Sequence, residues 1–227
     1  MKLQKETTGQ AQGHGKWYGD ACGTAFGMEL IGERWSLLVV RELILGARRF
    51  SDLRASLPGI SAKVLTERLG TLEAAGVLVK RKLPPPVSAQ VYELTQWGYA
   101  AEPMVQEIGR WAAMSSQHDP TLPLSPVSFM LSLRTMFDPA KARGIKARIG
   151  FRFPDTAFVA ELRDGVLPVV RAEPDDCDAV FTAAAAPALA VMFYVGIPAE
   201  EVGVTIEGDA AAAARFMGIF ELPEKIG

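Results

Sequence analysis

The stretch RRFSDLRASLPGISAKVLTERLGTLEAAG, residues 48–76, contains the pattern of two short helices joined by a tight turn. Ser51 is placed to cap the first helix, SDLRASL, which the dipeptide Pro58-Gly59 ends. Ser61 is placed to cap the second helix, which continues to Ala75. Two capped helices with so short a connection predict a helix-turn-helix unit.

The helix predicted for residues 62–75 has two unlike faces. Leu65, Leu69 and Leu72 fall on one side of a helical wheel and predict a buried stripe. The opposite face is short-chained, with a cation at its N-terminal end, and consists of Lys63, Glu67, Gly70 and Ala74, flanked by Thr66 and Thr71. Such a face can lie in a DNA major groove, because long side chains would hold the helix away from the bases.

The segments around this pair complete a larger pattern. Helices are predicted for residues 24–32 and 35–45 before it. After it, the alternating runs VLVKRKL and AQVYELT flank PPPVS and predict a β-hairpin with a stiff tip. One long helix is predicted for residues 95–114. The helix at 35–45, the capped pair, the hairpin and the trailing helix follow the order of a winged helix, a variant of the helix-turn-helix.

Charge is distributed unevenly along the chain. The net charge is −2, but residues 48–82 hold eight basic and three acidic residues, a local charge of +5. Residues 119–227 hold ten basic and fifteen acidic residues, a local charge of −5. This division favours a basic working surface on the first part alone, although ordinary solvated charge gives the same numbers.

We expect Lys63 and Thr66 to read base edges, and the helix start at Ser61 to meet a phosphate. The residues expected at double-stranded DNA are Arg48, Arg49, Ser51, Ser61, Ala62, Lys63, Thr66, Glu67, Gly70, Lys80, Arg81 and Lys82. The alternative is a small three-helix packing unit with solvated lysines.

The motifs IGERW, RELILG, RRFSDL, LPGIS, KVLTERL and YELT, with Cys22 before them and Trp111 after them, occur in this order. The stretch from Cys22 to Trp111 closely resembles the HxlR family of winged-helix regulators. The resemblance implies a DNA-binding repressor or activator that dimerises through its terminal helices. Gly23 departs from the family, whose members usually have proline after the cysteine, and this chain is longer than the family's typical single domain.

Two further expectations concern this stretch. Some members of the family use the cysteine at the position of Cys22 to sense oxidants, so Cys22 is a candidate redox sensor, with an inert buried thiol as the alternative. The trailing helix has more apolar surface than one small domain needs, which predicts a homodimer. The residues expected at that interface are Trp97, Met104, Val105, Ile108 and Trp111.

The second half predicts an α+β domain, an antiparallel sheet with helices on it. The run from residue 147 to 173 alternates and turns at Asp164-Gly165, a strong hairpin dipeptide. DDCDAVFTAA and VTIEGD predict further strands, and helices are predicted from about Ala186 to Tyr194 and in AAAARFMGIF.

The segments LRDG, DAVFTAAAAPALAVMF, IEGD and RFMGIF resemble those of the sterol carrier protein-like domain. The resemblance implies an apolar tunnel between sheet and helices that takes a lipid-like or aromatic effector. The residues expected to line this effector pocket are Phe151, Phe153, Met192, Phe193, Phe216 and Phe220, with a simple core role as the alternative for each.

Several classes of protein are disfavoured. Two cysteines, two histidines and no cluster with metal-ligand or catalytic spacing argue against a metal site, a cofactor and an enzyme. No secretory signal or membrane span is visible, which favours the cytoplasm.

The expected organisation is a flexible tail (1–16), a winged helix (17–114), a linker (115–126) stiffened by prolines at 120, 123 and 126, and a sterol carrier protein-like domain (127–227). The predicted function is a homodimeric transcriptional regulator, a repressor, acting on an inverted-repeat operator and responding to an apolar effector. The alternative is a lipid or small-molecule carrier, or an interaction protein, whose winged helix does not bind DNA.

Overall fold

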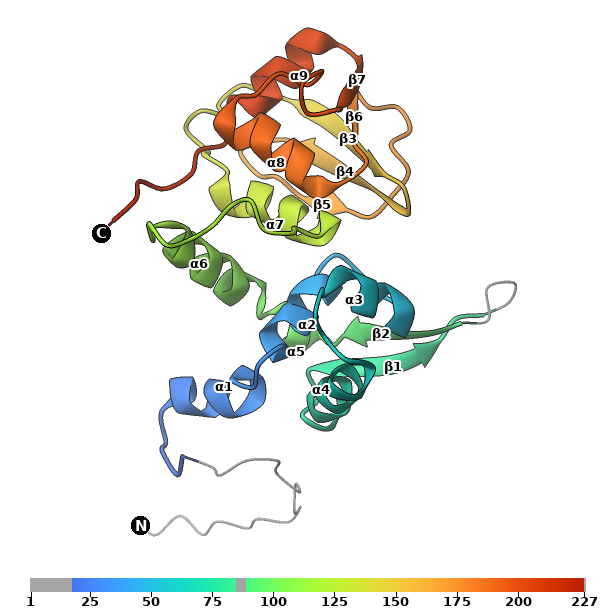
Figure 1. Ribbon diagram of the computed structural model, residues 1–227, viewed down its shortest axis with the longest axis vertical. Helices are drawn as coiled ribbons and strands as arrows, with labels where there is room; N and C mark the ends of the chain where they lie inside the picture. The colour runs from blue at the N-terminus through green and yellow to red at the C-terminus, as the bar shows by residue number, and fades with distance from the viewer. Residues whose placement is uncertain (1–17, 85–88, 227) are drawn as a thin grey trace.

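A computed structural model describes residues 18–84 and 89–226. The predicted tail and most of the hairpin tip lie outside the described residues. Two layered parts follow one another along the chain, with a hairpin projecting from the first (Figure 1). The N-terminal part contains α1 (Gly23–Ile31), α2 (Ser36–Leu43), α3 (Phe50–Ser56), α4 (Ala62–Ala74), β1 (Leu78–Lys82), β2 (Gln90–Leu94), α5 (Gln96–Tyr99) and α6 (Glu102–Ala113).

The helix-turn-helix prediction is confirmed in its main features. Ser61 caps α4, because its Oγ accepts a hydrogen bond from the Val64 N–H at 3.2 Å. Leu65, Leu69 and Leu72 form the predicted buried stripe. The start of α3 differs from the expectation, since its N-cap is Arg49 rather than Ser51.

The long helix predicted for residues 95–114 is wrong in one respect, because it is two helices. Thr95 caps α5, which ends at Tyr99, and a two-residue turn separates it from α6, which begins at Glu102. Pro103 stands in the first turn of α6, where its missing N–H costs no helical hydrogen bond. In the middle of a continuous helix the same proline would remove one.

The C-terminal part contains α7 (Pro126–Met136), β3 (Ala147–Phe153), β4 (Thr156–Leu162), β5 (Val169–Val170), β6 (Ala179–Thr182), α8 (Ala186–Val195), β7 (Thr205–Gly208) and α9 (Ala210–Met217). One sheet with the order β5-β4-β3-β6-β7 supports the helices (Figure 1). The expectation of an antiparallel sheet is wrong at one pair, because β3 and β6 run parallel. The cause is topological: β5 occupies the free side of β4, and residues 171–178 carry the chain back across the sheet to the open edge of β3, where β6 runs in the same direction as β5 and β3. Alternating residues identify a strand but do not specify its neighbour.

The two parts pack directly on each other through α7. The carboxylate of Glu42, on α2, is completely buried at this junction. Its Oε1 accepts a hydrogen bond from the Oγ of Ser125, the N-cap of α7, at 2.7 Å. An ion pair of 2.7 Å between Arg134 on α7 and Glu102 on α6 adds a second link. Side-chain contacts therefore tie the two parts together, in addition to the linker.

Candidate nucleic-acid interface

The outer face of α4 is open along its length. Lys63, Thr66, Glu67 and Gly70 are all exposed, and a side chain added at Gly70 would meet no atom within 4 Å. The hydroxyl of Thr66 donates to the carbonyl of Ala62 at 2.9 Å, which holds this side chain close to the helix. The first turn of α4 thus presents one flexible cation on a surface of short side chains.

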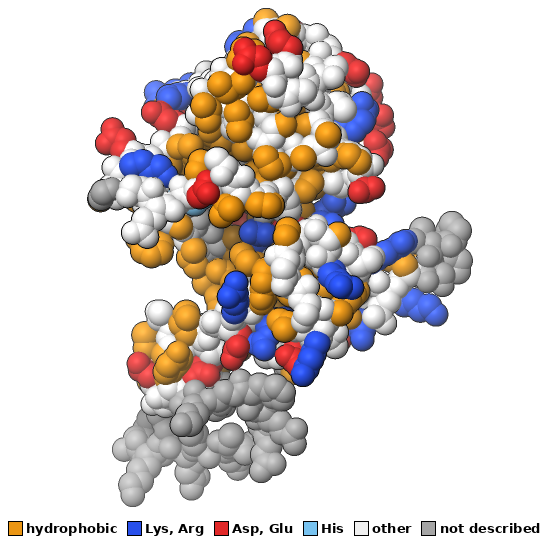
Figure 2. All heavy atoms as spheres, viewed as in Figure 1, with side chains coloured by type: hydrophobic (Ala, Val, Ile, Leu, Met, Phe, Trp, Pro, Cys, Tyr) orange, Lys and Arg blue, Asp and Glu red, His pale blue; other side chains and the backbone are white. Residues whose placement is uncertain are grey.

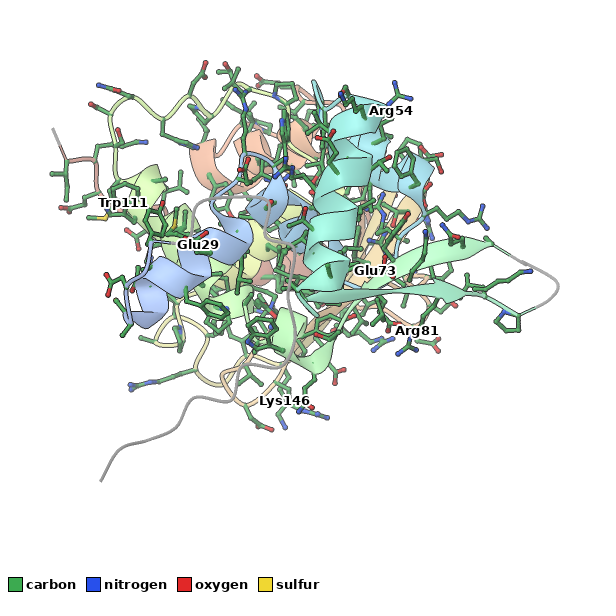
Figure 3. All side chains as sticks on the ribbon, turned by 90° about the horizontal axis from the view of Figure 1, so that it is seen from below. Glu29, Arg54, Glu73, Arg81, Trp111 and Lys146 are labelled. Atoms are coloured by element: carbon green, nitrogen blue, oxygen red, sulfur yellow. The ribbon has the colours of Figure 1, made fainter. Side chains whose placement is uncertain are left out.

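Figure 3 shows how the neighbouring elements frame this helix. α4 lies across the front of the view from below, Arg54 projects beyond one end of it, and the hairpin that carries Arg81 extends beside it. Arg54, on α3, is exposed and was not among the residues expected at DNA. The spacing of Leu53 and Leu57 could have identified Arg54 from the sequence. These two leucines are buried on one face of the helix, which turns Arg54 towards the outside.

The structure separates two arginines that the sequence places together. Arg49 is exposed at the N-cap of α3, as a phosphate contact requires. Arg48 is turned inward, and its Nη2 donates to the Ser56 hydroxyl at 3.1 Å while its Nη1 lies 3.6 Å from Glu42 Oε2. The expectation that Arg48 contacts DNA is therefore wrong, because its charge is engaged inside the protein.

The basic residues of β1 are all on the surface. Lys80, Arg81 and Lys82 are exposed, although alternation alone guaranteed only one outward position. The Nζ of Lys80 lies 5.7 Å from the centre of the Tyr92 ring, and Arg81 forms an ion pair of 2.9 Å with Glu93. Figure 2 shows Lys and Arg side chains around the N-terminal part and towards the hairpin tip. A nucleic acid lying on α4 would pass close to this strand.

Other expected DNA contacts have local partners. Ser51 is exposed, but its hydroxyl donates to Asp52 Oδ1 at 3.0 Å. Ala62 is exposed in the first turn of α4, where the Ser61 hydroxyl is occupied as the helix cap. Glu67 lies 3.9 Å from Arg68 Nη2. Glu67 lies on the outer face of α4 and the other residues border it, and none of them supplies a cation.

The expected dimer surface is largely exposed. Trp97, Met104, Ile108 and Trp111 are exposed, and Trp111 retains 74% of its accessible surface. Val105 differs, because it is half-buried and packs on the protein's own core. The helix α1, which has no buried residue, lies on the same side of the molecule as α6 in Figures 1 and 3. Together, α1 and α6 leave an apolar face uncovered in the single chain.

Cys22 is exposed and stands at the N-cap of α1, so the alternative of a buried thiol is wrong. Hydrogen bonds from the backbone N–H of Ala25, then from the backbone and the side chain of Thr24, lower the pKa of the Cys22 thiol. Burial instead raises the pKa of the Cys177 thiol. The two cysteines therefore differ in both exposure and acidity.

The residues expected to line an effector tunnel lie in the core of the C-terminal part. The rings of Phe151 and Phe193 are completely or almost completely buried, with centroids 6.1 Å apart. The ring centroids of Phe216 and Phe220 are 5.0 Å apart, and Met192 is buried in the same core cluster. This geometry is that of a packed aromatic core. Phe153 also lines a cleft at the junction of the two parts.

Within the described residues, no group of three or more potential metal ligands lies together. No described helix is both long and apolar enough to cross a membrane.

Comparison with known proteins divides the chain into the same two parts. Residues 30–120 match the model of the HxlR-like helix-turn-helix family, and residues 116–226 match that of the alkyl sulfatase C-terminal family. The chain is 42% identical over 86 residues to the HTH-type transcriptional regulator YvaP of Bacillus subtilis, an alignment that spans 37% of this chain and 79% of YvaP.

Two solved structures are also similar. The reduced form of the transcriptional regulator YodB from B. subtilis is 32% identical, with a TM-score of 0.39, over 43% of this chain and 98% of YodB. The sec-alkylsulfatase Pisa1 from a Pseudomonas species is 24% identical, with a TM-score of 0.39, over 43% of this chain and 16% of that enzyme.

Proposed function

This chain belongs to the HxlR-like helix-turn-helix family, and from that premise we propose that it is a DNA-binding transcriptional regulator that acts as a homodimeric repressor on an inverted-repeat operator. The observation that carries the proposal is the outer face of α4, which is exposed, short-chained and begins with Lys63. Helix-turn-helix proteins place such a face in the major groove with its N-terminal residues at the base edges. The relative YvaP is itself named as an HTH-type transcriptional regulator.

The proposed dimer rests on a second surface, the exposed apolar face of α1 and α6. α1 buries none of its own residues, and α6 exposes Ile108 and Trp111. A second copy that covers both helices would give a symmetric dimer with two α4 helices. Such a dimer requires an operator with two half-sites related by a twofold axis. We also propose a cytoplasmic location, because both cysteines are free thiols, as a reducing compartment keeps them.

The role of the C-terminal part is also a proposal. A sterol carrier protein-like identity is a prediction from sequence, and the matching family model is that of the alkyl sulfatase C-terminal domain. We assign this part the binding of a small effector and no catalytic step. Its direct packing on α2 and α6 through α7 gives an effector a physical route to the DNA-binding helices.

Selection from a library of random double-stranded DNA tests the proposal. The full chain is incubated with the library, and bound DNA is recovered and sequenced over several rounds. We expect enrichment of an inverted repeat with half-site centres about 10 base pairs, or a multiple of that distance, apart. Recovery of no common sequence would overturn the proposal.

The Lys63→Ala variant refines the same experiment. It should lose preference at one base pair of each half-site, a change of about 1–3 kcal/mol, because a base contact carries sequence information. Lys146→Ala, on the C-terminal part, is the matched control and should recover the wild-type sequence. A Lys63→Ala variant with unchanged preference would remove Lys63 from the base-reading set.

A further inference from the structure

A cleft of about 920 Å³ lies at the junction of the two parts. One wall comes from α3 and the turn before it, and the other from the strand ends and the loop after β5, with residues 123–126 between them in the chain also lining the cleft. Much of its lining is apolar, including Ala55, Pro58, Leu124, Phe153, Ala157 and Ala186. A cleft of this volume is within the range of sites for small organic molecules.

One side chain in this cleft has hydrogen-bonding groups without partners. The guanidinium of Arg171 lies over the ring of Phe158, 4.7 Å from its centre, and its Nη1 donates to the Thr156 hydroxyl. The Nε and Nη2 of Arg171 are buried, and neither has a hydrogen-bond acceptor among the described residues. Buried donors of a charged group are costly to leave unpaired.

The two unpaired donors share one edge of the guanidinium. Nε–H and one N–H of Nη2 point in the same direction, with the spacing of the two oxygens of a carboxylate. A single carboxylate can satisfy both donors in one bidentate contact once neighbouring side chains move aside, because both nitrogens are closed to solvent in this conformation. The edge is held in place, because Nη1 is fixed by Thr156 and the flat face rests on Phe158.

The charged groups around Arg171 do not occupy this edge of its guanidinium. Burial, and then the nearby charge of Arg48, lower the pKa of Arg171 to about 10, so it is still a cation at neutral pH. Glu42 and Asp52 attract it, but neither is hydrogen-bonded to it. Asp155 and Glu173 also line the cleft, but both are exposed, and water screens their charge.

We propose that this cleft binds a small organic carboxylate, whose two oxygens pair with the Nε and Nη2 of Arg171 and whose apolar body lies against Leu124 and Phe153. The regulatory part of this inference rests on the proposed function. Arg48 and Asp52 of the cleft belong to α3 or the turn before it, so the ligand contacts the first helix of the helix-turn-helix. Occupancy then biases the orientation of α3 and α4 relative to the C-terminal part.

Calorimetric titration of the full chain without DNA tests the site. The probes are octanoate, its neutral counterpart octanamide, and acetate, which has the carboxylate without the apolar body. We expect saturable binding of octanoate and affinities about tenfold or more weaker for the other two, because each lacks one half of the recognition. Equal affinities for octanoate and octanamide, or no binding of octanoate, would overturn the site.

Two variants locate the binding. Arg171→Gln should weaken octanoate binding about tenfold or more, whereas Arg163→Gln, an exposed arginine of the same part, should leave it unchanged. Ala55→Trp, on the exposed side of α3, should block the cleft without altering Arg171. It keeps the test valid if Arg171→Gln fails to fold. Wild-type affinity in Ala55→Trp would place the octanoate elsewhere and overturn the inference.

A last titration separates the site from its regulatory role. Octanoate binding is measured with and without the DNA recovered by selection, and linkage requires each ligand to change the affinity of the other by the same factor. A difference supports the regulatory part of the inference. Unchanged octanoate affinity would overturn that part while the site itself stands. A chain that binds octanoate but selects no DNA sequence would overturn the proposed function alone.

Discussion

The N-terminal and C-terminal parts place their aromatic and charged side chains in opposite ways. In the N-terminal part, leucines fill the interior, whereas Trp97 and Trp111 and most of the basic residues are outside. In the C-terminal part, phenylalanines pack against each other inside, and more of its exposed charge is acidic. Figure 2 shows red side chains mainly around this upper part.

This contrast shows where each part can meet a partner. The N-terminal part exposes large side chains that are costly to leave in water, so its binding surfaces lie on its exterior. In the C-terminal part, the phenylalanine side chains lie in the core and are not exposed to a partner. Its candidate binding site therefore lies at the junction, where Arg171 faces the other part.

The largest effect is expected in the aromatic core. Phe151 is completely buried, with its ring stacked on that of Phe181 at 5.5 Å. Phe151→Ala should reduce the free energy of unfolding by about 3–5 kcal/mol, because it leaves a cavity. Val166→Ala, an exposed position of the same part, should change it by less than about 0.5 kcal/mol. Urea unfolding measures both, and a Phe151→Ala variant of wild-type stability would mean that this region is an open pocket.

The next effect concerns the exterior of the N-terminal part. Ile108→Asp should raise the dissociation constant of the dimer on the order of a hundredfold, because a carboxylate would be buried in an apolar interface. Val166→Asp should leave the dimer intact. Sedimentation velocity over a range of protein concentrations distinguishes the two. A wild-type chain that sediments as a monomer would show that α1 and α6 serve another purpose.

A smaller effect separates the two arginines before α3. Arg49→Ala should weaken binding to all DNA sequences about equally and reduce the slope of log affinity against log salt by about one, because one phosphate contact is lost. Arg163→Ala is the control of equal charge in the C-terminal part and should leave the slope unchanged. Fluorescence anisotropy with labelled DNA at several salt concentrations gives both slopes. An unaltered slope for Arg49→Ala would exclude Arg49 from the interface.

The smallest effect compares the two cysteines. Hydrogen bonds from Ala25 and Thr24 lower the pKa of Cys22, whereas burial raises that of Cys177. As the pH falls, Cys22 should therefore keep its thiolate to a lower pH than Cys177 and react severalfold faster with iodoacetamide at pH 8. Mass spectrometry of alkylated peptides measures each site, with Cys22→Ser as the control. Faster alkylation of Cys177 would contradict this order.

The sequence alone determined those features that depend on neighbours along the chain. Ser61, the leucine stripe and the turn at residues 58–59 specify the helix-turn-helix locally, because helix caps and periodicity act within a few residues. The hairpin follows from the same kind of pattern, although alternation guaranteed an outward position to only one of its three basic residues. The division into a basic first part and an acidic second part is also a property of the sequence.

Only the tertiary structure decided which side chains meet across the chain. Arg48 and Arg49 look alike in the sequence, but Glu42 and Ser56 draw one inward and leave the other free for a partner. The tertiary structure also decided that β6 runs parallel to β3. The residues expected to line a tunnel are packed into the core instead. The sequence also does not show that Nε and Nη2 of Arg171 are buried without a hydrogen-bond partner among the described residues, because contacts between residues distant in the chain determine which buried charges are paired.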